Sequence, residues 1–425
     1  MGLLTDHYEL TMVDAALHAG IADRRCVFEV FCRRLPLGRR YGVVAGTARM
    51  LEAVRAFRFD ERALNFLERA EVVGSQALRY LADYRFTGDI EGYREGEPFF
   101  PHSPILTVTG GFAEAVVLET VILSILNHDC AIAAAASRMV NAAHGRTLLE
   151  FGSRRTHEEA AVAAARAAIV AGFDATSNLE AGARYGLRTT GTAAHAWTLL
   201  FDEERESFVA QVAALGEGTT LLVDTYDIAA GIDNAIEVGG TGLGGIRIDS
   251  GHLPDEAKWA RQRLDDAGAT GTKIVVSGDL DEYAIADLNE TPIDGYGVGT
   301  RLVTGSGHPT ANLVYKLVAR ESVSGGMQHV EKLSPDKQTR GGHKRGFRRL
   351  GSRGRATAEI ARALADGPGE GRHLTMPLVA EGESLAHPGI DDIRAHHRLA
   401  INELPDEARR LSDGPPCLPT EGPPT

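Results

Sequence analysis

With 425 residues, 43% of them hydrophobic and 24% charged, the chain can bury a large core, divide into two domains and remain soluble. Its net charge of −13 argues against nucleic acid as the main partner, because phosphate backbones are bound by an excess of Lys and Arg. The four cysteines, Cys26, Cys32, Cys130 and Cys417, form no CxxC pair. This favours a reducing cytoplasm over secretion and argues against a zinc site.

The first 110 residues or so predict a separate α/β region. A helix is expected near residues 9–19, a strand in VFEVFCRRL at 27–35, a helix near 46–57 and further strands up to 109. The apolar stretch that follows, 112–136, is interrupted by Glu114, Glu119, His128 and Asp129. We therefore expect buried helices there and no membrane span.

From residue 147 onward, strand candidates alternate with helical sequence, which is typical of parallel βα units. The helix after 155 carries a predicted capping box, Thr156 with Glu159, and Gly172 is placed to end it. A second such helix covers 255–267. There are seven strand candidates, one fewer than a closed barrel contains: 147–151, 174–177, 187–190, 219–223, 245–248, 273–276 and 294–298.

The C-terminal part is less regular. Residues 332–355 concentrate nine Lys or Arg among glycines, which favours a solvated, mobile segment, with a basic lid over a phosphate-rich substrate as the alternative. A helix is expected near 356–365. The Pro-rich tail from residue 414 predicts no regular structure.

Polar residues follow the strands repeatedly. Arg247 and Asp249 are two residues apart on an extended segment, so their side chains point to the same side and can converge on one small ligand. Ser, Gly and Asp are also turn formers, and Asp224, Asp249 and Asp279 could simply neutralise nearby arginines. The strand-end residues are Phe151, Gly152, Ser153, Arg154, Arg155, Ser177, Asn178, Gly191, Thr192, His195, Asp224, Thr225, Asp227, Arg247, Asp249, Ser250, Ser277, Gly278, Asp279, Gly297, Gly299 and Thr300.

Two glycine patterns have different meanings. The segment 297–307, GVGTRLVTGSG, offers backbone N–H groups after the last strand, where barrel enzymes often bind phosphate. The GxGxxG at Gly240, Gly242 and Gly245 precedes a strand, whereas a dinucleotide fingerprint follows one, so it predicts no dinucleotide site. His195 by itself is as consistent with a hydrogen-bonded core histidine as with a reactive one.

Nine short segments carry a recognisable pattern: LLTDHYELTM (3–12), FCRRLPLG (31–38), EFGSRR (150–155), TSN (176–178), GTAAHAW (191–197), DTYD (224–227), RIDSG (247–251), SGDLDE (277–282) and GVGTRLVTGSG (297–307). As a set, these segments resemble the nicotinate phosphoribosyltransferase family. The resemblance implies an incomplete TIM-like α/β barrel at 111–320, and a second, discontinuous α/β domain in which residues 1–110 are completed by segments of 321–425. It also implies a homodimer.

The resemblance further implies transfer of phosphoribose from phosphoribosyl pyrophosphate to nicotinate, with Mg²⁺ and coupled ATP hydrolysis. Tyr8 and Phe151 would sandwich the pyridine ring, with Arg247 near its carboxylate and Thr192 close by. Asp249 and Asp279 would hold the ribose hydroxyls, and Arg154 and Asp224 would lie near the reacting groups. Gly278, Gly297, Gly299 and Thr300 would line the phosphate end, and Ser277 would also bind substrate. His195 would be phosphorylated by ATP.

Two residues depart from the family pattern. Ala196 replaces the usual Ser after the histidine, which concerns the coupling to ATP, and His252 replaces an Asp, which concerns metal or ribose binding. Three alternatives remain open at this point. They are a nicotinamide-specific enzyme, a quinolinate phosphoribosyltransferase and a catalytically silent barrel that binds nucleotides.

Overall fold

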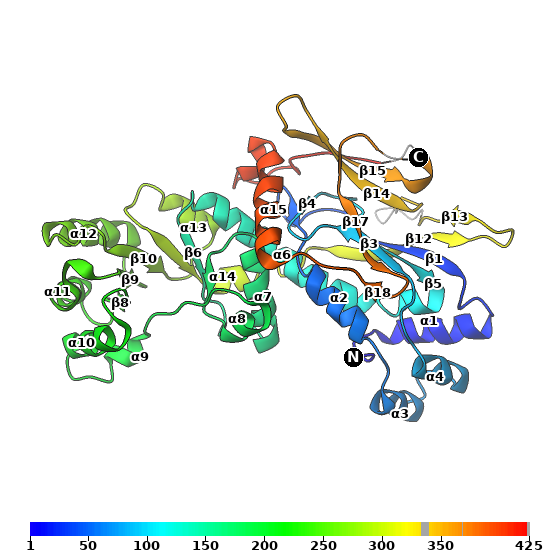
Figure 1. Cartoon of the computed structure of the whole chain (residues 1–425), viewed down its shortest axis with the longest axis horizontal. Helices are drawn as coiled ribbons and strands as arrows, with labels where there is room; N and C mark the ends of the chain where they lie inside the picture. Colours follow the sequence, from blue (N-terminus) through cyan, green and yellow to red (C-terminus); the bar gives the residue numbers. More distant parts are fainter. Residues whose placement is uncertain (333–339, 368, 423–425) are drawn as a thin grey trace. The chain divides into compact units, whose positions relative to one another are not determined.

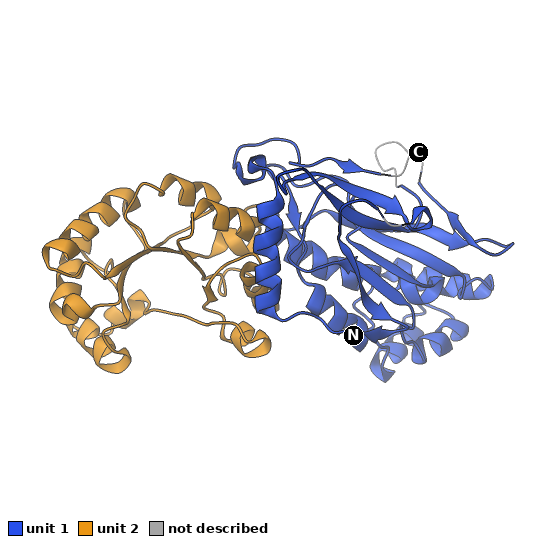
Figure 2. Cartoon of the chain, turned by 45° about the horizontal axis from the view of Figure 1, so that its top comes forward, with its two compact units in different colours: residues 1–134, 308–425 blue, residues 135–307 orange. Residues whose placement is uncertain are grey.

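The computed structural model describes residues 1–332, 340–367 and 369–422. The chain forms two compact units, shown in Figure 2: residues 1–134 together with 308–425, and residues 135–307. The predicted domain boundaries near residues 110 and 320 stay a prediction. Since one unit contains both ends of the chain, the other unit is an insertion within it.

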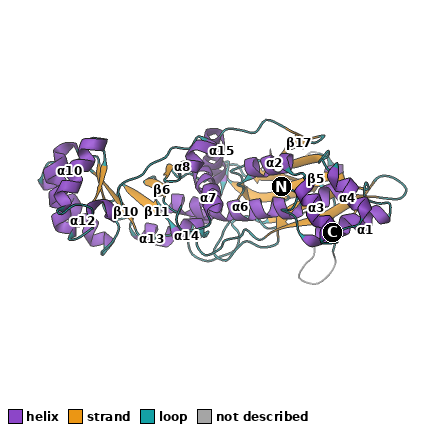
Figure 3. Cartoon of the chain, turned by 90° about the horizontal axis from the view of Figure 1, so that it is seen from below, coloured by secondary structure: helices purple, strands orange, loops and turns teal. Residues whose placement is uncertain are grey.

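The inserted unit is built on a six-stranded sheet in which every pairing is parallel. The sheet is curled, with helices around its outer side (Figure 2), and α10 (Glu204–Leu215) and α12 (Leu253–Asp266) lie beside its strands in Figure 3. This confirms the incomplete α/β barrel. The strands, in sheet order, are β7 (Ala175–Thr176), β6 (Thr147–Glu150), β11 (Gly295–Val298), β10 (Lys273–Ser277), β9 (Gly245–Ile248) and β8 (Thr220–Leu222).

Two local predictions for this unit were wrong. The candidate strand 187–190 makes only one parallel bridge, between Thr189 and Thr176. Its neighbour β7 is only two residues long, which is too short to pair with a full strand. Helix α7 (Glu158–Val170) begins after His157, whose side chain accepts a hydrogen bond from the Glu159 N–H, so the capping box of Thr156 does not form. The other helices of the unit are α8 (Leu179–Tyr185), α9 (His195–Thr198), α11 (Ile228–Gly239), α13 (Glu282–Asp287) and α14 (Thr300–Val303).

The other unit contains a seven-stranded sheet made from both ends of the chain (Figure 1), which confirms the discontinuous second domain. Alternate residues of its strand β1, including Cys26, Phe28 and Val30, join the main apolar core with α1 (His7–His18) and α2 (Thr47–Ala56). The strands, in order, are β13 (Met327–His329), β12 (Leu313–Glu321), β1 (Arg25–Cys32), β5 (Leu106–Gly111), β3 (Asp89–Tyr93), β17 (Thr375–Ala380) and β18 (Glu383–Ser384).

The apolar stretch after residue 111 forms α5 (Phe112–Val116) and α6 (Glu119–Ala142). By length and composition alone, the combined segment Phe112–Ala142 could cross a membrane. However, 61% of its most apolar window is buried inside the protein, and Val121, Ile122 and Leu126 belong to the main core. Its apolar character therefore has an explanation in core packing, as the sequence predicted.

The end of the chain adds a second, four-stranded sheet: β16 (Arg372–His373), β14 (Lys344–Leu350), β15 (Ala356–Ala363) and β19 (Thr420–Glu421). The helix predicted near 356–365 was wrong, because these residues pair with β14 along its length. The tail has more structure than its composition predicted. The Arg40 guanidinium donates to the backbone carbonyls of Ser412, Asp413 and Pro415, and β19 pairs with β15.

The basic segment 332–355 is partly folded into its own unit where the structure describes it, and residues 333–339 lie outside the described residues. The alternative of a basic lid over a phosphate-rich substrate stays a prediction. In the described part of this segment, basic side chains of β14 contact acidic residues of the same unit. Lys344 Nζ lies 3.1 Å from Glu29, and Arg345 Nη2 lies 2.6 Å from Glu91. The expectation of a solvated segment was therefore wrong for Lys344 and Arg345, which are counter-ions of acidic residues, whereas residues 352–355 are exposed as expected.

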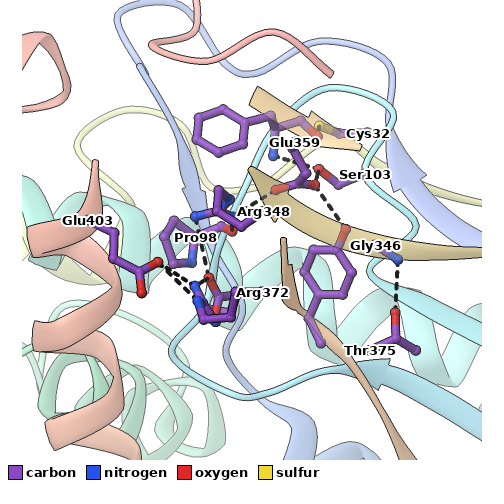
Figure 4. Close-up of polar contacts among 12 residues, drawn as sticks. Cys32, Pro98, Ser103, Gly346, Arg348, Glu359, Arg372, Thr375 and Glu403 are labelled. Carbon is purple, nitrogen blue, oxygen red and sulfur yellow. Dashed lines mark hydrogen bonds and ion pairs between the residues drawn. The ribbon is translucent and has the colours of Figure 1, made fainter. Parts of the chain in front are cut away.

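Arg348 is the most enclosed of these cations, with a side chain that is 0% exposed. Its Nη2 donates to Glu359 and to the Pro98 carbonyl, both at 2.8 Å, and Glu359 also accepts from Ser103 (Figure 4). Burial by itself raises the pKa of Glu97, but hydrogen bonds from His396 and Arg372 and the charge of Arg348 hold it down to about 2. The network thus joins the two ends of the chain, and removal of one partner would leave a buried charge unpaired.

We predict that His397 makes the folded protein sensitive to acid. Burial lowers the pKa of His397 to about 4, and its Nδ1 lies 2.8 Å from the Gly96 carbonyl oxygen. As pH falls from about 6.5 toward about 4, the unfolded chain binds a proton that the folded protein does not. The free energy of unfolding therefore falls, by up to about 1.4 kcal/mol per pH unit.

The test is the thermal unfolding of the wild type and of His397→Asn, whose amide can still donate to Gly96, at about pH 7.5 and about pH 5. The variant should unfold at a lower temperature than the wild type near neutrality, and the gap should narrow in acid. His18→Asn, at an exposed histidine, is the control and should show no such narrowing. An equal gap at both pH values for His397→Asn would contradict the prediction.

Candidate active site

A cleft of about 250 Å³ opens at the carboxyl ends of the parallel strands. Parallel strands that end at one edge bring together residues that are far apart in sequence, as expected for a barrel. Six of the predicted site residues line this cleft: Phe151, Arg154, Thr192, His195, Arg247 and Asp249. Its other lining residues are Ser153, Ser177, Gly191, Ala193 and Ala194.

Arg247 is the central cation of the cleft. It lies on β9, which is hydrogen-bonded to strands on both sides, so its backbone is fixed. Its Nε donates to Ser277 Oγ at 3.0 Å and its Nη1 to Thr192 Oγ1 at 2.6 Å. The guanidinium lies 5.6 Å from the centre of the Phe151 ring, within cation–π range. These contacts restrain the guanidinium through Nε and Nη1 and place it beside an aromatic face.

The carboxylates near Arg247 are connected through hydroxyl groups. Asp249 Oδ1 lies 3.6 Å from Arg247 Nη2 and accepts a hydrogen bond from Ser277. Asp224 Oδ2 accepts from the Asp249 N–H at 2.9 Å and from the Ser250 hydroxyl at 2.6 Å. The other oxygen, Asp224 Oδ1, is buried and has no hydrogen-bond partner among the described residues. Asp224 therefore orders the loop after β9 and keeps one oxygen for a further partner.

The Phe151 ring needs a glycine on the neighbouring strand. A Cβ on Gly297 would lie 2.6 Å from two atoms of the ring, and a Cβ on Gly278 would lie 2.9 Å from the Asp249 carbonyl oxygen. Gly278 also has a φ of +121°, which few other residues adopt. These two glycines allow the close packing of the strand ends.

Of the residues predicted for the phosphate and ribose end, Asp249 lines the described cleft. The others lie at the same sheet edge outside its lining: Gly278, Asp279, Gly297, Gly299 and Thr300. Asp279 is exposed and has a φ of +47°, directly after Gly278. Gly299 precedes α14, which begins at Thr300. The roles of Gly278, Asp279, Gly297, Gly299 and Thr300 thus remain predictions.

Two further predicted residues have different surroundings. His195 begins α9 and is half-buried, with Nδ1 3.2 Å from Thr225 Oγ1, which leaves Nε2 as the candidate reactive nitrogen. Tyr8 belongs to the other compact unit, where it lies in α1 and is 44% exposed. Its predicted place over the ring of a substrate remains untested.

The sequence reasoning missed Glu150 and gave Thr176 no role. Glu150 is fully buried at the end of β6, directly before Phe151, and accepts hydrogen bonds from Gly152 and Thr176. An acidic residue at the end of the apolar strand TLLE was the signal available, since a buried carboxylate requires donors.

Comparisons with known proteins agree with this architecture. Residues 3–127 match the nicotinate phosphoribosyltransferase N-terminal domain, and residues 132–306 match the quinolinate phosphoribosyl transferase C-terminal domain. Over 430 residues the chain is 54% identical to nicotinate phosphoribosyltransferase pncB1 of Mycobacterium tuberculosis, covering 99% of this chain and 94% of that protein. It is 38% identical to nicotinate phosphoribosyltransferase of Bacillus subtilis, covering 82% and 73%. The crystal structure of human nicotinic acid phosphoribosyltransferase superposes with a TM-score of 0.84 at 26% identity, covering 97% and 96%.

Proposed function

Since the chain belongs to the nicotinate phosphoribosyltransferase family, we infer that it makes nicotinate mononucleotide and pyrophosphate from nicotinate and phosphoribosyl pyrophosphate, in NAD biosynthesis. The observation that carries this function is the restrained Arg247 guanidinium beside the Phe151 ring. Nicotinate is a flat aromatic ring with one carboxylate. An aromatic face binds the ring without hydrogen bonds, and a guanidinium pairs with the carboxylate.

The remaining roles follow from the charge that develops during the reaction. Displacement at the anomeric carbon makes the sugar positively charged in the transition state, and carboxylates near the ribose stabilise that charge. Asp249 and Asp279 would hold the ribose hydroxyls, while Asp224 and Arg154 would act near the reacting groups. Gly278, Gly297, Gly299 and Thr300 would serve the phosphate end of the donor, and Ser277 would also bind substrate.

The side chains of the candidate site fit Mg²⁺ only if the ion takes most of its ligands from water and substrate. The described residues contain no cluster of three or more His, Cys, Asp or Glu that could hold a metal ion by themselves. Mg²⁺ commonly keeps its waters and takes one or two carboxylates together with substrate phosphates. The unpartnered Asp224 Oδ1 is suited to supply one such oxygen. When bound, the ion would neutralise charge on the departing pyrophosphate.

ATP coupling would use His195. Its Nδ1 contact with Thr225 leaves Nε2 to accept a phosphoryl group from ATP, and imidazole is a competent nucleophile for this step. Ala196 removes a hydroxyl beside it, which would weaken a phosphate contact. The remaining proposals are a cytoplasmic location and a homodimer in which Tyr8 of one subunit completes the site of the other.

We predict that Arg247 selects an acid over an amide. Arg247→Ala should lose about 2–5 kcal/mol of binding to nicotinate, because a charge-assisted pair disappears, and much less with nicotinamide. The measurement is kcat/KM with nicotinate, nicotinamide and quinolinate, side by side. Arg205→Ala, at an exposed arginine of α10, is the control and should behave like the wild type.

Nicotinate turnover that survives Arg247→Ala within a few fold would show that Arg247 is not the anchor. If the wild type prefers nicotinamide or quinolinate, the chain is the corresponding alternative enzyme. If it uses none of the three pyridines, the catalytically silent barrel is the correct interpretation.

We predict that His195→Ala abolishes ATP hydrolysis and leaves slow synthesis of nicotinate mononucleotide, because phosphorylation assists the main reaction without being part of its chemistry. ATP consumption and product are measured together, with His157→Ala, at an exposed histidine, as the control. Continued ATP hydrolysis in step with product would assign the coupling to another residue. A wild type without any ATP effect would indicate that Ala196 has disabled it.

We predict that Tyr8→Ala and Arg247→Ala homodimers are each nearly inactive and that mixing them restores activity. In a symmetric dimer with shared sites, a mixed dimer has one site with both lesions and one site with neither. The two variants carry different tags and are refolded together, so that mixed dimers can be purified. Mixed dimers that stay as inactive as their parents would place Tyr8 in its own subunit's site or outside any site.

A further inference from the structure

Glu150 is a buried carboxylate without a cation. It is 0% exposed at the end of β6, and no Lys, Arg or His among the described residues forms an ion pair with it. Burial raises the pKa of Glu150, while hydrogen bonds from Thr176 and Gly152 act in the opposite direction. Such a group is costly to bury, so its hydrogen bonds define what it does.

Those hydrogen bonds connect two loops of the candidate site. One carboxylate oxygen accepts from the Gly152 N–H, and the other accepts from the Thr176 hydroxyl. The Thr176 hydroxyl in turn accepts from the Asn178 N–H at 2.9 Å, and the Asn178 amide donates to Ser153 Oγ at 3.2 Å. The loop after β6 is therefore tied to the loop after β7 at both of its sides.

Phe151 lies between these anchored residues. Its N–H donates to the Val298 carbonyl at 2.8 Å, and its ring packs where Gly297 has no side chain. Gly152 is equally constrained, because a Cβ there would lie 2.1 Å from Val303 Cγ1 and 2.8 Å from Glu150 Oε1. The Glu150 carboxylate accepts the Gly152 N–H and therefore fixes its direction. The path of the chain through Phe151 depends on that direction.

We propose that Glu150 is a positioning residue of the transferase reaction, which holds the Phe151 ring at the acceptor end of the cleft. The proposal rests on the proposed function, since it assumes that Phe151 contacts the nicotinate ring. Glu150 does not touch the cleft itself, and it acts through the Gly152 N–H and the Thr176 hydroxyl.

The test compares Glu150→Gln and Thr176→Val with the wild type in steady-state kinetics. Gln offers one acceptor where Glu150 offers two, and Val removes the hydroxyl without changing the shape of the side chain. For each variant we expect KM for nicotinate to rise about tenfold, and KM for phosphoribosyl pyrophosphate to change less than about twofold. The double variant should be little worse than either single one, because both changes break the same connection.

Glu282→Gln is the matched control. Glu282 is also a buried carboxylate of this unit, but it pairs with Arg138 at 2.9 Å and accepts from Ser306 at 2.6 Å, away from the cleft lining. It should lower the unfolding temperature and leave KM for nicotinate unchanged. If Glu150→Gln does not fold, Thr176→Val carries the same comparison.

The outcomes separate the proposals. A variant with a lower unfolding temperature and an unchanged KM for nicotinate would make Glu150 a purely structural residue and overturn the inference. An equal rise in both KM values would also overturn it, because the effect would not be specific to the acceptor. A wild type that makes no nicotinate mononucleotide would instead overturn the proposed function.

Discussion

The candidate site depends on how the Arg247 guanidinium is held. Its backbone is fixed by neighbours on both sides of β9, and its side chain is restrained by hydroxyls from two other strand ends, Thr192 and Ser277. These two hydroxyls are neutral and do not cancel the charge of the cation, and its ion pair with Asp249 is a long one, at 3.6 Å. The nearby carboxylate of Asp249 is partly occupied by Ser277. The guanidinium therefore keeps charge to offer an anionic ligand, which a direct bidentate ion pair inside the protein would have used.

In the unit that contains both chain ends, ion pairs connect two sheets. Its two sheets meet through Lys344, Arg345 and Arg348, which pair with Glu29, Glu91 and Glu97 from the other end of the chain. Apolar contacts would bring the sheets together in many registers, whereas a buried ion pair is costly in any register but one. We infer that these pairs specify how β14 docks, beyond any stability that they add.

Two of the errors in the sequence predictions share a physical cause. Residues 356–365 contain five Ala, which favour a helix locally, but pairing with β14 forms a strand. The basic segment around β14 looked solvated because its acidic partners, Glu29, Glu91 and Glu97, lie hundreds of residues away in sequence. In both cases a contact that forms only in the folded protein outweighed a local preference. The sequence does not show such contacts directly.

The sequence by itself determined the parallel α/β barrel, the strand ends that carry the site and the family, because strand periodicity and short motifs are local properties. It also placed six residues at the ends of three predicted strands, and these residues meet in one cleft: Phe151, Arg154, Thr192, His195, Arg247 and Asp249. Only the tertiary structure decided which hydroxyls restrain Arg247, that Asp224 orders the loop after β9, and that Glu150 accepts a hydrogen bond from Thr176. Those contacts join separate strands, and their geometry exists only once the sheet has curled and closed its strand ends together.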